Sequence, residues 1–230
     1  MEYNEEELNN LKYELALKYD KRNYCQYYIS LLRTKHDILF TFFNNTDYNS
    51  KIIKIDLFLF NFILNYAVNT LFFSDDTMHQ IYEDKGSFNL IYQLPQIAYS
   101  MLISTVFNIL IKILALSEGL IITFKKKKEK RNLDKRMNML NSKLKTKFII
   151  YFIVSSIFLL FFWYYISMFC SIYVNTQIHL IKDTLLSFAL SFVYPFGINL
   201  IPGICRIPAL SNSKNKRSYL YSFSKLIQLI

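Results

Sequence analysis

The chain has 230 residues, of which 53% are hydrophobic, 17% aromatic and only 19% charged, so it is richer in apolar side chains than an average soluble domain. Four Gly and four Pro are too few for a β-sandwich, a collagen or a glycine-rich nucleotide fold, which predicts an all-α protein. The net charge of +10 would suit nucleic acid, but the basic residues are grouped between apolar runs. We therefore expect no nucleic-acid partner.

Four apolar runs are long enough to cross a bilayer as helices, which takes about 20 residues each. They cover about residues 55–73, 94–116, 148–174 and 184–205. The third has 27 consecutive uncharged residues, more than a soluble fold of this size would cover with polar surface. The predicted fold class is an all-α polytopic membrane protein with four transmembrane helices and amphipathic N- and C-terminal helices.

The segments outside the 55–205 membrane bundle form an N-terminal region, 1–54, and a basic tail, 206–230. From Tyr24 to Leu39, apolar residues recur at helical spacing opposite a basic face, and the tail repeats this pattern more weakly. Such helices suit the surface of an anionic bilayer. They equally suit packing against other parts of the protein, and the sequence leaves both open.

The basic residues are distributed unevenly between the connecting segments. Of the 27 Lys and Arg, 24 lie in residues 1–54, 117–147 and 206–230, whereas the two alternate loops hold only Lys85 and Lys182. By the positive-inside rule, both termini are expected in the cytoplasm, with no indication of which membrane. A polybasic run in the middle segment is expected to contact anionic lipid headgroups or simply to fix the topology. Its members are Lys125, Lys126, Lys127, Lys128, Lys130 and Arg131.

Polar residues inside the predicted spans are candidate functional residues, because burying them in a bilayer is costly. Asp56 and Lys112 both lie near the cytoplasmic ends of antiparallel spans, where they either pair or reach the interface separately. Asn61, Asn65 and Asn69 share one helix face. With Asn108 they could join neighbouring helices, line a polar pathway, or only reflect an Asn-rich composition. The sequence leaves these alternatives open, with helix-to-helix hydrogen bonding favoured.

The fourth span contains helix-breaking residues. Pro195 and Pro202 each remove a backbone donor, so we expect a kink near residues 191–198. Gly197 and Gly203 would let a neighbouring backbone approach. We expect this span to be the internally packed helix, with the third span more exposed to lipid.

The loop after the first span raises the question of a metal site. Asp75, His79 and Glu83 would share a helix face, as metal ligands can. More simply, Ser74 caps a short helix whose first turn is acidic. The rest of the chain has none of the common zinc, nucleotide or hydrolase motifs. No metal and no cofactor are predicted.

Several uncommon stretches resemble the multi-span C-terminal module of large uncharacterised protist transmembrane proteins, some of which carry leucine-rich-repeat or adhesin-like ectodomains. The stretches are YDKRNYCQYYISLLRTKHDILFTFF, DYNSKIIKIDLFLF, TMHQIYEDKGSFNLIYQLPQIAYS, LALSEG, NTQIHLIKDTLLSFALSFVYPFGINLIPG and RIPAL. The resemblance implies a membrane module and no particular chemistry. We expect no ectodomain before the module, unlike in the large members.

Three functions are consistent with these features. The first is a non-enzymatic membrane anchor or assembly module, which acts with a membrane-protein partner or a second copy. The second is a small ion channel or transporter, suggested by the polar residues and broken fourth span. The third is an integral-membrane enzyme acting on lipid, for which the sequence shows no convergent catalytic set.

Overall fold

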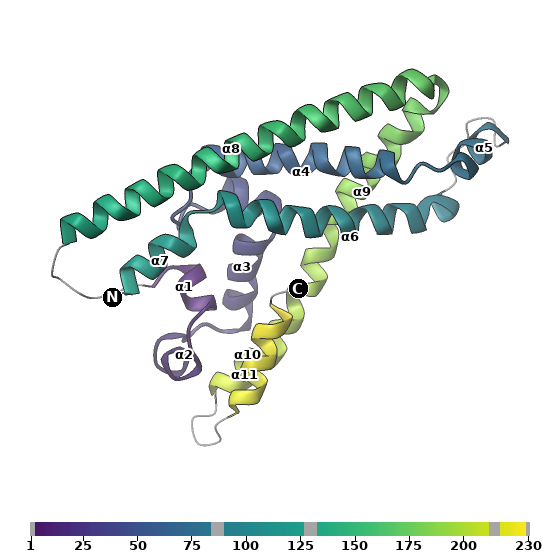
Figure 1. The fold of residues 1–230 in the computed structure, drawn as a ribbon. Helices are drawn as coiled ribbons and strands as arrows, with labels where there is room; N and C mark the ends of the chain where they lie inside the picture. The colour runs from purple at the N-terminus through teal and green to yellow at the C-terminus, as the bar shows by residue number, and fades with distance from the viewer. Residues whose placement is uncertain (1–2, 84–89, 127–132, 212–216, 229–230) are drawn as a thin grey trace. The chain divides into compact units, whose positions relative to one another are not determined.

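The computed structural model describes residues 3–83, 90–126, 133–211 and 217–228, which are helical with short connections and contain no strand. Contacts divide the chain into two compact units (Figure 1). Unit 1 comprises Met1–Lys51 and Phe192–Ile230, and unit 2 comprises Ile52–Ser191. The all-α class predicted from composition is confirmed.

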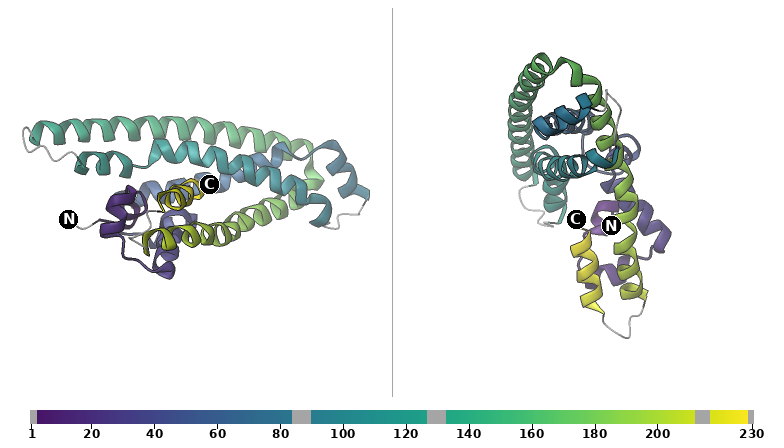
Figure 2. Two further views of the ribbon diagram at one scale, coloured as in Figure 1. Left: turned by 90° about the horizontal axis from the view of Figure 1, so that it is seen from below. Right: turned by 90° about the vertical axis from the view of Figure 1, so that its right-hand side faces the viewer.

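The elements of unit 2 follow one another as three long helices, their connections and most of a fourth: α4 (Lys51–Leu71), α5 (Asp75–Glu83), α6 (Leu90–Ala115), α7 (Glu118–Lys126), α8 (Leu133–Ile172), η2 (Val174–Thr176) and α9 (Gln177–Ile198). Helices α4, α6 and α8 run side by side in the views of Figures 1 and 2.

Four helical segments are long and apolar enough to cross a membrane, as predicted, and the fold class is therefore that of a polytopic membrane protein. They are Lys51–Leu71, Ile91–Ala115, Leu133–Ile172 and Val174–Ser211. The third and fourth extend beyond the predicted apolar runs, because helix continues into the polar residues before 148 and past 205. About 20 residues suffice to cross, so the described helix also continues outside the hydrocarbon.

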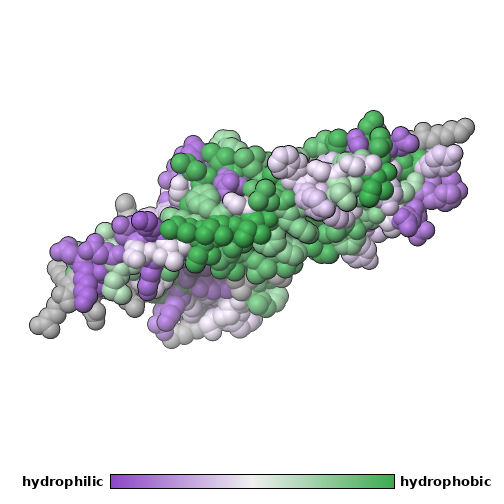
Figure 3. Space-filling model, turned by 45° about the horizontal axis from the view of Figure 1, so that its top comes forward, coloured by the Kyte–Doolittle hydropathy of each residue, from purple (hydrophilic) through white to green (hydrophobic). Residues whose placement is uncertain are grey.

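The expected packing order of the spans is partly wrong. The fourth span was expected to be internal, but only 22% of its most apolar window is buried, against 56% for α4. The third span is the least buried at 17%, which agrees with its expected exposure to lipid. Burial follows the position of α4 among its neighbours, not the prolines of the fourth span. Apolar side chains cover much of the face drawn in Figure 3, as a lipid-facing surface requires.

The core of unit 2 forms where α4 meets α6 and α8. Leu57 and Leu64 of α4 belong to the same apolar cluster as Ile111 of α6 and Phe162 of α8. A second apolar cluster contains Leu180 of α9, Phe169 near the end of α8, Ile81 of α5, and Phe73, which follows α4. These contacts hold α4 on three sides.

The short helix after α4 begins as predicted. The backbone N–H of Thr77 donates to Oγ of Ser74 at 3.3 Å, and Asp75 and Asp76 occupy the first turn of α5. The side chain of Ser74 thus satisfies one of the free donors at the helix start.

Unit 1 is built from both ends of the sequence: α1 (Glu5–Asn9), α2 (Tyr13–Tyr19), α3 (Tyr24–Lys35) and the π-helical turn η1 (Leu39–Phe43) combine with α10 (Leu200–Ser211) and α11 (Ser218–Ile227). Tyr27 and Leu31 on the apolar face of α3 are fully buried. Hydroxyls of the same helix bond to carbonyls near α10, from Tyr24 to Leu200 at 2.8 Å and from Tyr28 to Phe196 at 3.0 Å. The apolar face of α3 is therefore packed inside the protein, the second of the two predicted alternatives.

The predicted break in the fourth span occurs at Asn199, between α9 and α10, one residue beyond the expected stretch 191–198. Pro195 lies inside α9. Pro202 lies in the first turn of α10, where backbone N–H groups have no acceptor within the helix, so a proline there removes no intrahelical hydrogen bond. A Cβ added at Gly203 would meet the ring of Tyr24 at 2.6 Å, so a side chain makes the close approach expected there from a backbone.

Candidate functional site

The asparagine stripe predicted on the first span is buried. Asn61, Asn65 and Asn69 of α4 are 5%, 2% and 0% exposed. The amide of Asn65 donates to the backbone oxygen of Asn61 at 2.9 Å and to its Oδ1 at 3.3 Å. Among the residues that the structure describes, neither amide atom of Asn69 has a hydrogen-bond partner. Asn65 thus donates along its own helix, and Asn69 joins no neighbouring helix.

Helix α6 also buries its polar residues. They recur mostly at four-residue spacing along one face: Gln93, Ser100, Ser104 and Asn108. Large apolar residues of the same helix, such as Leu102 and Leu110, are exposed instead. The hydroxyls of Ser100 and Ser104 find no partner within the described part of the chain. The sequence analysis identified only Asn108 of this face, because scattered serines in an apolar span give little signal.

Helix α9 has a third polar face, which the sequence analysis did not identify. His179, Asp183 and Ser187 follow one another every four residues and are 4%, 0% and 0% exposed. Both carboxylate oxygens of Asp183 and the hydroxyl of Ser187 lack a hydrogen-bond partner among the described residues. The fourth span was expected to begin at residue 184, so Asp183 was counted with the loop. Its four-residue spacing from His179 and Ser187 was the signal that could have found it.

Ring contacts show where α9 meets α4. Phe188 of α9 lies against Phe58 and Phe62 of α4, with centroids 5.8 and 5.0 Å apart. The two helices cross obliquely in Figure 1.

Of the two charged residues predicted inside spans, Asp56 of α4 has a partner on another helix. It accepts a hydrogen bond from the hydroxyl of Tyr151 on α8, and Tyr151 is fully buried. Tyr151 was not identified from the sequence, because one tyrosine among many in the third span has no distinguishing spacing. The predicted pairing of Asp56 with Lys112 stays a prediction.

Most of the polybasic run, residues 127–131, lies outside the described residues, and only Lys125 and the backbone of Lys126 are placed, at the end of α7. Nearby, Leu114 of α6 and residues of α8 line an open depression of about 340 Å³. Its α8 residues are Ser142, Lys143, Thr146, Lys147 and Ile150. The surface that lines this depression is mainly apolar. Lys147 also donates to the carbonyl of Leu116 at 2.6 Å.

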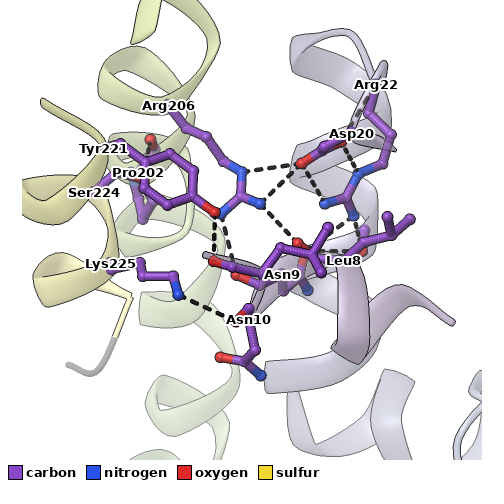
Figure 4. A network of polar contacts seen from close by, with 12 residues as sticks. Leu8, Asn9, Asn10, Asp20, Arg22, Pro202, Arg206, Tyr221, Ser224 and Lys225 are labelled. Carbon is purple, nitrogen blue, oxygen red and sulfur yellow. Dashed lines mark hydrogen bonds and ion pairs between the residues drawn. The ribbon is translucent and has the colours of Figure 1, made fainter. Parts of the chain in front are cut away.

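Unit 1 contains a buried charge network centred on Arg206 (Figure 4). Arg206 of α10 is 0% exposed. It donates to Oδ2 of Asp20 from Nε at 3.1 Å and from Nη2 at 2.8 Å, and to the carbonyls of Leu8 and Asn9 at 2.7 and 3.1 Å. Arg22 donates to both oxygens of the same carboxylate, at 2.8 and 2.9 Å. One carboxylate thus pairs with two guanidinium groups.

Aromatic rings and C-terminal residues complete this network. The guanidinium of Arg206 lies 4.8 Å from the ring centroids of both Tyr27 and Tyr221, an attractive cation–π arrangement. The hydroxyl of Tyr221 donates to the carbonyl of Leu11 at 2.8 Å, and Ser224 donates to the carbonyl of Pro202 at 2.9 Å. All of these contacts lie within unit 1. They join α10 and α11 to α1 and to Asp20, the residue that follows α2.

The charges of this network shift the acidity of Asp20. Burial opposes its ionisation, but the hydrogen bonds and charge of Arg22, together with the charge of Arg206, outweigh that effect. The pKa of Asp20 therefore lies below its ordinary value. Burial raises the pKa of the neighbouring Tyr27 and Tyr221, so both rings remain neutral. The network is a stable structural cluster and presents no reactive group.

Comparison of the chain with protein-family models, curated proteins and solved structures finds no match. In the described part of the chain, no three His, Cys, Asp or Glu side chains gather as a metal site would require. The site with the strongest indication of function is therefore the set of buried polar faces on α4, α6 and α9, which we call the polar interior of unit 2.

Proposed function

We propose that unit 2 is a small membrane transport unit whose polar interior conducts or binds a small cation. The observation that supports this is the sidedness of the helices. On α4, α6 and α9, polar side chains recur on the buried faces while large apolar residues face outward. Polar residues inside transmembrane bundles commonly mark solute and ion pathways.

Stability does not account for this arrangement. A buried polar group that loses its water without gaining a partner costs roughly 1–3 kcal/mol. Atoms of Asn69, Ser100, Ser104, Asp183 and Ser187 are all without partners among the described residues. Apolar residues at these positions would pack better, so the polar groups are best explained by a ligand that meets them.

Oxygen atoms dominate the available groups, which supports a cation rather than an anion. Asp183 contributes the carboxylate, and amides and hydroxyls contribute neutral oxygens. Hard cations prefer such ligands.

Cation flux into liposomes tests the proposal. The full chain is reconstituted with pH-sensitive or Na⁺-sensitive dye inside, and a gradient is applied. We expect flux above that of protein-free vesicles, and a reduction by Ser104→Val. Its neighbour Thr105 bonds back to the carbonyl of Met101 on its own helix, so Thr105→Val serves as the matched control. Absence of flux, or an equal effect of the two variants, would contradict the proposal.

The second candidate is a membrane anchor or assembly module, and the Arg206 network favours it. By joining residues from both ends of the sequence, this network gives unit 1 one defined surface that a partner or second copy can recognise. Chemical crosslinking in native membranes tests this role. We expect larger adducts with the natural sequence that are lost in Arg206→Ala and kept in Arg33→Ala. Adducts unaffected by Arg206→Ala would count against it.

The anionic-lipid contact and the resemblance to protist membrane modules stay predictions. Both fit a multi-span protein with basic segments between its spans.

A further inference from the structure

Asp183 is an ionisable residue that is fully buried in unit 2. It lies on the second turn of α9, is 0% exposed, and neither of its carboxylate oxygens has a hydrogen-bond partner among the residues described. Asp20 in unit 1, also buried, is surrounded by two arginines. The contrast shows that this protein supplies partners to a buried carboxylate where the carboxylate serves the fold.

An unpartnered carboxylate in this position needs a positive charge. An ionised carboxylate removed from water without a counter-charge is strongly unfavourable, more so inside a bilayer than in a soluble core. The group is therefore neutralised by something that the protein itself does not supply. A proton bound to the carboxylate or a metal cation coordinated by it would do so.

The neighbouring side chains indicate the charge of that cation. On α4, the buried Asn65 has an Oδ1 that accepts no hydrogen bond among the described residues. One turn away along α9 lies Ser187, whose hydroxyl is equally unsatisfied. One negative charge with neutral oxygen donors balances a single positive charge, whereas divalent sites usually hold more than one carboxylate.

Other titratable groups lie on α9 and on the elements around it. Helix α5, whose Ile81 belongs to the same apolar cluster as Leu180 of α9, carries Asp75, Asp76, His79, Tyr82 and Glu83. On the same helix, His179 lies one turn toward the helix start, and Lys182 is exposed. The neighbouring helices contribute Tyr66 on α4, Tyr99 on α6, and Tyr165 and Cys170 on α8, and Tyr173 follows α8. None of them is bonded to Asp183.

We propose that Asp183 is the cation-binding group of the polar interior and holds one monovalent cation, a proton or Na⁺, together with the hydroxyl oxygen of Ser187. This inference rests on the proposed function of unit 2, because it names the class of ion and the residue that binds it. The proton and Na⁺ share the required chemistry and compete for the same carboxylate.

Dicyclohexylcarbodiimide tests the site without a transport measurement, because it modifies protonated carboxyl groups in apolar surroundings. The full chain in liposomes is treated with the reagent across a pH series, in choline chloride and in NaCl of equal ionic strength, and the modified residue is located by mass spectrometry. We expect modification of Asp183 that falls as the pH rises. Asp183→Asn should abolish it, whereas Asp76→Asn, at an exposed position of α5, should not.

The effect of Na⁺ distinguishes the two ions. If Na⁺ is bound, NaCl slows the modification at constant pH several-fold relative to choline chloride; if only the proton is bound, the two salts give equal rates. Failure of Asp183 to react at any pH in choline chloride, in protein that remains folded by circular dichroism, would overturn the inference. Reaction of Asp183 without flux in liposomes would retain the site and reject the transport function. If Asp183 of the unchanged chain does not react and cation flux persists in Asp183→Asn, the transport function is retained and the site is rejected.

Discussion

Arg206 and Asp20 are separated by 186 positions in the sequence, yet two guanidinium nitrogens of Arg206 bond to one carboxylate oxygen of Asp20. The side chains of both are almost fully buried, at 0% and 2% exposure. Removing Asp20 would leave the guanidinium of Arg206 buried without a counter-charge, a loss that costs about 3–5 kcal/mol. Removing Arg206 leaves Asp20 paired with Arg22, so only the hydrogen bonds and ring contacts of Arg206 are lost. The pair therefore controls whether the N-terminal helices stay joined to α10 and α11.

Arg206→Ala is expected to destabilise unit 1 by about 1.5–3 kcal/mol, because charge-assisted hydrogen bonds are lost, measured as the free energy of opening in native-state proteolysis of the detergent-solubilised chain. Arg206→Lys should also be strongly destabilising, because a lysine cannot reproduce the planar donors and the two ring contacts. The exposed ion pair between Arg33 and Glu5, 3.0 Å long, provides the control. Arg33→Ala should change stability by less than about 1 kcal/mol, and an equal loss in both variants would show that burial is not the cause.

Stability of unit 1 should fall in acid. The folded pKa of Asp20 is lowered, so its ionised form stabilises the fold. This contribution is complete above the unfolded pKa, near 3.8, and is lost as the pH falls through the still lower folded value. The same proteolysis measured across a pH series should show this loss. Asp20→Asn should be less stable at neutral pH and should show a flatter decline in acid; an unchanged decline would assign the acid sensitivity to other groups.

Gly203→Ala is expected to destabilise unit 1 by about 1–3 kcal/mol, the usual range for overpacking. The added Cβ would lie 2.6 Å from Cε2 of Tyr24, whose hydroxyl is held by the carbonyl of Leu200 at 2.8 Å. The ring can move only by losing that bond. Gly197→Ala is the control, because no described atom lies within 4 Å of its added Cβ and alanine favours helix over glycine. Thermal unfolding of both variants should separate them, and a stable Gly203→Ala protein would contradict the contact.

The sequence was sufficient for the helical class and the four spans, because length and hydropathy are local properties. It also predicted the cap at Ser74, which depends on only four neighbouring residues. The burial of Asn61, Asn65 and Asn69 on one face followed from their spacing, though the unsatisfied amide of Asn69 did not. That depends on what the neighbouring helices place opposite it.

The residues that the sequence analysis missed are those whose role depends on distant partners. Arg206 was assigned to a basic tail and Asp20 was not considered, because nothing in either neighbourhood indicates a contact across most of the chain. Asp183 was missed for a different reason. The fourth span was predicted to begin directly after it, at residue 184, so this buried carboxylate was counted with the preceding loop.

The orientation of the chain in the membrane follows from the distribution of basic residues and can be tested with cysteine labelling. Cys25 is exposed on α3, on the side predicted to be cytoplasmic, and Asp76 is exposed on α5, in a loop predicted to lie on the other side. A membrane-impermeant maleimide added to intact cells should therefore leave Cys25 unmodified until the membrane is permeabilised. In a Cys25→Ser background, Asp76→Cys should react before permeabilisation, whereas Cys25→Ser alone should give the background from Cys170 and Cys205. Reaction of Cys25 in intact cells, with Asp76→Cys protected, would reverse the predicted orientation while leaving the four spans unchanged.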